Sequence, residues 1–143
     1  PTRRSSDLEE AFFMKKEVYE TRKEILGEEH SVTLAAQGNL AYTLNHLGRF
    51  AEALPLSEQA YKICLSKYGE EHLRTIKFME RGALSKKGLG RKEEALEILQ
   101  KVYELRKKVQ GNDHKNTLET LQNMVSILED LGRYEEAEAL KDS

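Results

Sequence analysis

Three histidines are the residues of this sequence whose type and spacing first suggest chemistry. His30, His72 and His114 recur at one constant interval, and imidazole is a common zinc ligand. Equivalent residues of stacked repeats lie roughly 10 Å apart at helix-packing distances, whereas the ligands of one zinc ion lie about 2 Å from it. We therefore expect no metal site, and predict that each histidine caps backbone N–H groups at the start of a helix.

Cys64, the only cysteine, is the single candidate nucleophile of the thiol type. It lies beside an apolar stripe with no acid–base partner at a readable spacing, so we expect a buried, inert thiol. No glycine-rich phosphate loop, Ser–His–Asp arrangement or paired-ligand motif occurs. The sequence predicts no enzyme, no metal and no cofactor. One thiol without an internal partner fits a reducing, cytoplasmic setting.

Composition excludes two further classes of protein. Charged residues make up 34% of the chain, but the net charge is only −2, so no clustered basic surface for nucleic acid is expected. No apolar run approaches the roughly 18 residues of a membrane span. Two prolines among many Glu, Lys, Leu and Ala residues indicate an all-α protein.

An internal repeat organises the chain, and its period is the interval from His30 to His72. Eight positions are identical in three copies, and self-similarity of this kind is typical of stacked helical repeats. In the first copy these positions are Gly27, His30, Thr33, Leu47, Gly48, Arg49, Glu52 and Ala53. The repeat therefore decides the architecture before any single motif does.

Each period contains two helical patterns separated by a glycine. The first runs from about 31 to 47, with Leu34, Leu40 and Leu44 on one stripe, and the second from about 50 to 68. Gly48 is expected to end the first helix in a left-handed conformation, and Gly69 to do the same for the second. Short loops make the helices antiparallel, and neither can bury its stripe without a neighbouring pair. The prediction is an α-solenoid.

We predict seven helices over the whole chain. Residues 8–26 form a partial repeat, and repeats follow at 31–68, 73–110 and 115–143, the last one shortened. The faces around Phe12, Phe13 and Leu140 then lack neighbours, so we expect association through uncapped ends and a natural protein that continues on both sides. Residues 1–8 are interpreted as a non-native or disordered leader, similar to a translated sequencing adapter.

The motifs of these repeats resemble a known family. YGEEHLRTI, LGRYEEAEAL and GNLAYTLNHLGRFAEAL are similar to the kinesin-light-chain type of tetratricopeptide repeat, a variety with long helices, over residues 8–143. The resemblance implies a right-handed superhelix whose first-type helices line a concave groove for peptides or partner proteins. Gly82 departs from the pattern, since Leu40 and Met124 stand there in the other copies, and it should loosen the middle hairpin.

Polar side chains on the inward stripe of the first-type helices are the candidate binding residues. They are Asn39, Tyr42, His46, Lys77, Arg81, Glu119 and Asn123. The two asparagines match the residue that this type of repeat turns toward a bound peptide, whose backbone an amide can both donate to and accept from.

Lys77 and Arg81 lie one helical turn apart. Together with Asn39 they resemble part of the carboxylate clamp with which some tetratricopeptide domains hold an acidic chain end. The alternative is that these cations pair with Glu80 or other acids on a solvated surface.

We therefore expect a scaffold that binds a protein or peptide partner, with an acidic segment as the candidate ligand. One alternative is a regulatory or sensor segment of a larger signalling protein or enzyme whose catalytic domain lies elsewhere. Another is a self-assembling structural repeat. The full-length reading frame would show whether a catalytic domain accompanies these repeats, which distinguishes the regulatory segment from the other two hypotheses. Sedimentation of a capped protein would distinguish a self-assembling repeat from a binding scaffold.

Overall fold

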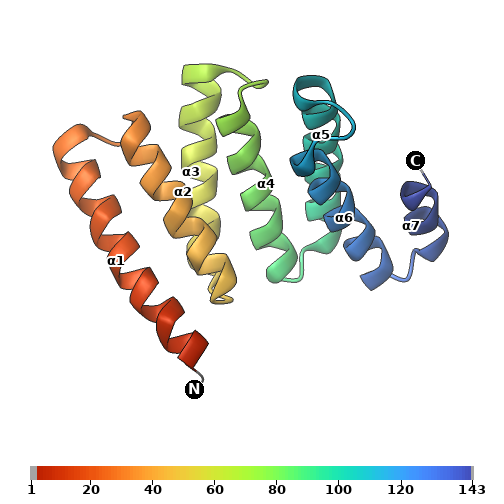
Figure 1. The fold of residues 1–143 in the computed structure, drawn as a ribbon, viewed down its shortest axis with the longest axis horizontal. Helices are drawn as coiled ribbons and strands as arrows, with labels where there is room; N and C mark the ends of the chain where they lie inside the picture. The colour runs from red at the N-terminus through yellow and green to blue at the C-terminus, as the bar shows by residue number, and fades with distance from the viewer. Residues whose placement is uncertain (1–2, 143) are drawn as a thin grey trace.

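The computed structural model describes residues 3–142, which form seven α-helices in one row (Figure 1). They are α1 (Arg3–Leu26), α2 (Ser31–His46), α3 (Phe50–Tyr68), α4 (Leu73–Gly88), α5 (Lys92–Gln110), α6 (Lys115–Asp130) and α7 (Tyr134–Lys141). The first and last helices, α1 and α7, lie at opposite ends of the row. The predicted all-α solenoid of about seven helices is confirmed.

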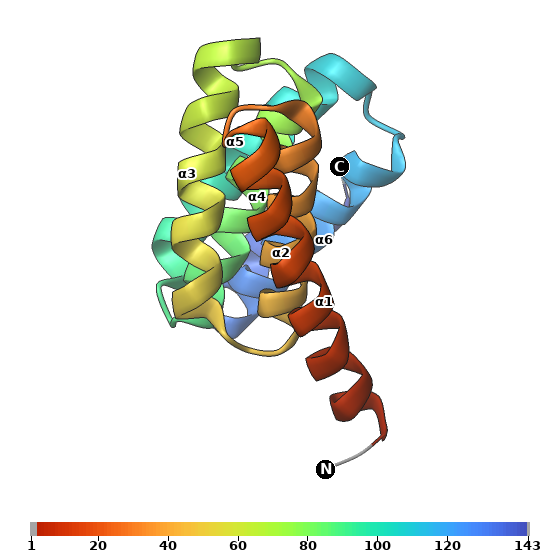
Figure 2. The same ribbon diagram turned by 90° about the vertical axis from the view of Figure 1, so that its left-hand side faces the viewer.

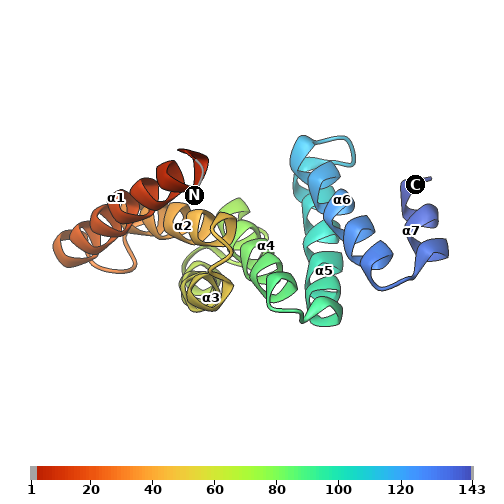
Figure 3. The ribbon, with the colours of Figure 1, turned by 90° about the horizontal axis from the view of Figure 1, so that it is seen from below.

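Each helix packs on the next one in the chain, and α2 also contacts α4 directly. Seen from below, α2, α4 and α6 follow one another along the array, whereas α3 and α5 are displaced to one side of them (Figure 3). The first-type helices therefore share one face of the solenoid. Within residues 3–142, no helix is both long and apolar enough to cross a membrane.

A histidine side chain caps the start of each first-type helix, as predicted. Nδ1 of His30 accepts a hydrogen bond from the N–H of Val32 at 3.1 Å, and His72 and His114 do the same for Arg74 and Asn116. The first N–H groups of a helix have no partner within it, so these caps fix where α2, α4 and α6 begin.

Two kinds of glycine turn join the helices. Gly48 has φ 76°, its N–H donates to Asn45, and the N–H of Arg49 donates to Leu44 O at 2.8 Å, which is the Schellman pattern of a left-handed cap. Gly69 has φ 89° and ψ 171°, which is an extended region open to glycine rather than the left-handed helical one. The left-handed prediction is therefore right for Gly48 and wrong for Gly69.

The predicted apolar stripes form the core. Leu34, Leu40 and Leu44 are at most 4% exposed, and Cys64 is fully buried, as expected. Phe12 corrects the prediction of an unpartnered end, because it is only 5% exposed and belongs to the cluster around Leu40. Its neighbour Phe13 is 64% exposed.

The first helix extends further toward the N-terminus than predicted. It begins at Arg3 rather than near Leu8, so residues 3–8 are helical, and its first turns project beyond the array (Figure 2). Residues 1–2 of the predicted leader lie outside the described part of the chain. The foreign origin of the leader stays a prediction.

Candidate functional site

A groove of about 590 Å³ runs across α2, α4 and α6. Six of the seven predicted binding residues line it, namely Tyr42, His46, Lys77, Arg81, Glu119 and Asn123. Asn39 is exposed on α2 but is not part of this lining. The helical phase thus brings side chains from three repeats to one concave surface.

The α2 wall of the groove is aromatic. The rings of Tyr42 and His46 lie 4.1 Å apart between centroids, and His46 Nδ1 lies 3.0 Å from the carbonyl oxygen of Tyr42. Tyr42 remains 48% exposed, and the guanidinium of Arg81 lies 5.4 Å from its ring centroid. A ligand can therefore pack on an aromatic surface that is already held in place.

Arg81 is held by the backbone of the preceding repeat. It donates through Nη1 to the carbonyl oxygen of Gly38, 43 residues earlier. A Cβ atom at Gly38 would lie 2.7 Å from that nitrogen, so glycine is what allows this approach. Burial lowers the pKa of Arg81. Its guanidinium links α2 to α4 and is committed before any ligand arrives.

Glu80 and Arg106, which both line the groove, belong to a largely buried network that joins α4, α5 and α6. The carboxylate of Glu80 accepts from Arg106 Nη2 at 2.8 Å and from Thr120 Oγ1 at 2.5 Å. Arg106 is 5% exposed, also donates to Gln110 at 3.0 Å, and keeps a buried Nε without a hydrogen bond to any described residue. Glu80 therefore pairs with Arg106, and not with Lys77 or Arg81 as the surface-pair alternative supposed.

Lys77 is the groove cation that the described part of the chain leaves unpaired. Its ammonium makes no hydrogen bond or ion pair with any described residue, whereas Arg74 donates to Ser31 O at 3.0 Å. Desolvation, followed by the positive charges of Arg81, Arg74 and Arg106, lowers the pKa of Lys77. A carboxylate bound here would offset that repulsion.

Comparison with known proteins identifies the architecture. The profile of the tetratricopeptide repeat family matches residues 2–66, 32–80 and 81–142. The chain belongs to the tetratricopeptide repeat family. The comparison with curated proteins gives no match.

Solved structures agree with this tetratricopeptide repeat assignment. A crystal structure of nearly identical repeats, assigned to a kinesin light chain of Podosopora anserina, has a TM-score of 0.85 and 25% identity. The alignment covers 96% of this chain and 65% of the other, so this chain spans 65% of that length. A single-substitution variant of the same protein gives the same values. The predicted kinesin-light-chain type is confirmed.

Sequence reasoning missed three charged residues of the groove lining in this tetratricopeptide array, Arg74, Glu80 and Arg106. A signal for Arg106 was present, because it follows Leu99 and Val102 at spacings of three and four and so falls on the buried stripe of its helix. A charge on such a stripe indicates a buried partner. The partner itself lies on another helix, 26 residues away.

No metal centre accompanies the groove within residues 3–142. Their His, Cys, Asp and Glu side chains form no group of three or more that could hold an ion. The three histidines instead serve as helix caps.

Proposed function

We propose that this chain is a binding scaffold that holds an acidic peptide or protein segment in the groove. The observation that carries the proposal is Lys77, an ammonium that no described side chain neutralises inside a concave, electropositive site. A carboxylate would form a charge-assisted hydrogen bond with it. The scaffold acts by binding rather than by catalysis, and the buried free thiol of Cys64 suits a cytoplasmic setting.

The neighbouring side chains define how such a segment lies. Tyr42 offers an exposed aromatic face, and the amide of Asn123 can donate to and accept from a peptide backbone. Glu119 on α6 would repel an acidic group. The acidic end of the ligand therefore lies toward α2, and Arg81 contributes its positive charge from a fixed position.

Fluorescence anisotropy with labelled acidic peptides tests the proposal. Wild type is compared with the Lys77→Ala, Arg81→Ala double variant and with a control, Lys62→Ala and Lys101→Ala, which removes the same charge from exposed positions on α3 and α5. The groove variant should lose about 2–4 kcal/mol of binding free energy, and the control should bind like wild type. Equal binding by both variants, or a preference of wild type for basic peptides, contradicts the proposal.

A further inference from the structure

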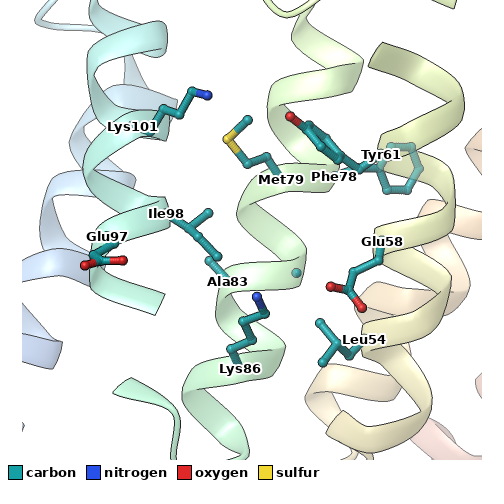
Figure 4. A pocket seen from close by; sticks show the side chains of 11 residues that line it. Leu54, Glu58, Tyr61, Phe78, Met79, Ala83, Lys86, Glu97, Ile98 and Lys101 are labelled. Atoms are coloured by element: carbon teal, nitrogen blue, oxygen red, sulfur yellow. The ribbon is translucent and has the colours of Figure 1, made fainter. Parts of the chain in front are cut away.

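A second concavity lies on the opposite side of α4 from the groove. This outer pocket, between α3 and α5, has a volume of about 340 Å³ (Figure 4). Its apolar lining includes Leu54, Phe78, Met79, Ala83 and Ile98, with Gly82 among them. The α4 residues that face the groove do not contribute to it.

The outer pocket exists because two apolar side chains are absent from α4. Gly82 stands where the other repeats have Leu40 and Met124, and Lys86 stands where they have Leu44 and Leu128. Those four side chains are all at most 4% exposed. A Cβ atom at Gly82 would meet its nearest neighbours, Ser57 and Leu54, at 3.8 and 4.0 Å. The middle repeat thus leaves open a space of the kind that its neighbours fill with Leu or Met.

The ammonium of Lys86 turns toward the centre of this pocket (Figure 4). It makes no hydrogen bond or ion pair with any described residue, whereas Lys101 on the rim lies 2.9 Å from Glu70. Two rim carboxylates, Glu58 and Glu97, stay beyond ion-pair distance of Lys86. An apolar pocket with one unpaired cation is complementary to an apolar group that carries one negative charge.

We propose that the outer pocket binds a small monocarboxylic acid with an apolar body. The carboxylate pairs with Lys86, and the body packs over Gly82 against Phe78, Met79 and Ile98. The volume falls within the range of about 300–1,000 Å³ typical of ligand sites. Glu58 and Glu97 on the rim repel a second negative charge, so a monoanion binds better than a dianion. This site is independent of the groove and of its peptide.

Octanoate is the probe, titrated into the 143-residue protein and followed by NMR at the Met79 methyl group and the Ala83 amide. Octanol has a similar body without charge, and octanedioate has a second carboxylate. Octanol lacks the charge pair with Lys86, and octanedioate adds a repelled carboxylate. Each should therefore bind at least about fivefold more weakly than octanoate, a factor that corresponds to about 1 kcal/mol for one partly exposed charge pair. Equal binding of octanol, or tighter binding of octanedioate, overturns the assignment of the charge. An absence of saturable octanoate binding overturns the proposal.

Three variants locate the site. Gly82→Leu fills the pocket with leucine, the residue at the equivalent position of the first repeat, Leu40. It should abolish octanoate binding, while the circular dichroism spectrum of the protein stays helical. Lys86→Gln should weaken octanoate to the level of octanol. Lys115→Gln removes the same charge at an exposed position on α6 and should leave binding unchanged. Octanoate binding that survives Gly82→Leu contradicts the proposal.

Discussion

Two sets of three residues stand at equivalent positions one repeat apart but differ in chemistry, and we call them the apolar layer and the polar layer. The apolar layer holds Gly38 on α2, Cys64 on α3 and Phe78 on α4. The polar layer holds Glu80 on α4, Arg106 on α5 and Thr120 on α6. In both layers the central side chain, Cys64 or Arg106, is at most 5% exposed, so the difference lies in chemistry and not in burial.

In the apolar layer, one large ring fills the space that a glycine leaves. Phe78 is 2% exposed, and its Cζ would lie 3.3 Å from a Cβ atom at Gly38. Cys64 packs in the same cluster, and burial raises the pKa of its thiol. In the polar layer the ring is replaced by the smaller Thr120, and Glu80 reaches both it and Arg106.

The two layers differ at all three positions, and each layer holds one guanidinium of the groove. Arg81 is held by the carbonyl of Gly38, and Arg106 is held by the carboxylate of Glu80. Each of these guanidinium groups already has a hydrogen-bond partner within the protein. Lys77, which belongs to neither layer, makes no hydrogen bond or ion pair with any described residue.

Removing the carboxylate of the polar layer should reduce the stability of the protein more than any of the other single substitutions. Glu80→Ala leaves Arg106 as a buried charge without its carboxylate, and should lower the free energy of unfolding by about 3–5 kcal/mol. Urea unfolding measures it. The matched control is Glu119→Ala, an exposed carboxylate on α6, which should change stability by at most about 0.5 kcal/mol. A loss at Glu80 as small as that at Glu119 would mean that the network is not stabilising.

Exchanging the whole set should restore most of that loss. The triple variant Glu80→Gly, Arg106→Cys, Thr120→Phe gives the polar layer the residues of the apolar one. Because apolar replacement of a complete buried ion pair is often nearly neutral, and a glycine within a helix costs about 1 kcal/mol, stability should lie within about 2 kcal/mol of wild type. A triple variant no more stable than Glu80→Ala breaks the idea of interchangeable sets.

Substitutions at two buried glycines, Gly38 on α2 and Gly82 on α4, should change the free energy of unfolding by smaller amounts and in different ways. Gly82→Leu fills the outer pocket and should raise the free energy of unfolding by about 1–2 kcal/mol, through helix propensity and burial. Gly38→Ala gains the same propensity but must displace Arg81 and Phe78, so it should be less stable than Gly82→Leu. Thermal unfolding of both variants decides the order, and the reverse order contradicts the packing described for Gly38.

The fold and the groove differ in how far the sequence predicts them. Glycines and histidines that recur once in every repeat mark helix ends through local geometry, which is why the seven helices were predictable. Helical phase also placed Tyr42, Lys77 and Asn123 on one surface. The partners of Arg81 and Arg106 were not predictable, because each contact joins two helices and its paired residues lie 43 and 26 positions apart in the chain. The contact of Arg81 also depends on Gly38, where a Cβ atom would lie too close to the guanidinium.

Helical spacing alone also does not determine which residues line the groove, as Asn39 illustrates. Its position on α2 satisfies the helical spacing, yet the groove is lined further along the helix, from Tyr42 to His46. Which turns of three helices meet depends on how the helices cross, and that angle is set by packing between repeats rather than by the pattern within one.

In the proposed complex Lys77, and not a guanidinium already held by the protein, binds the acidic group of the ligand. The dissociation constants of one acidic peptide for Lys77→Gln and Arg81→Gln test this assignment. Lys77→Gln should weaken binding about tenfold or more, as expected for loss of a charge-assisted contact, and Arg81→Gln should weaken it distinctly less. Equal affinity of Lys77→Gln and wild type, or a larger loss for Arg81→Gln, would contradict the claim.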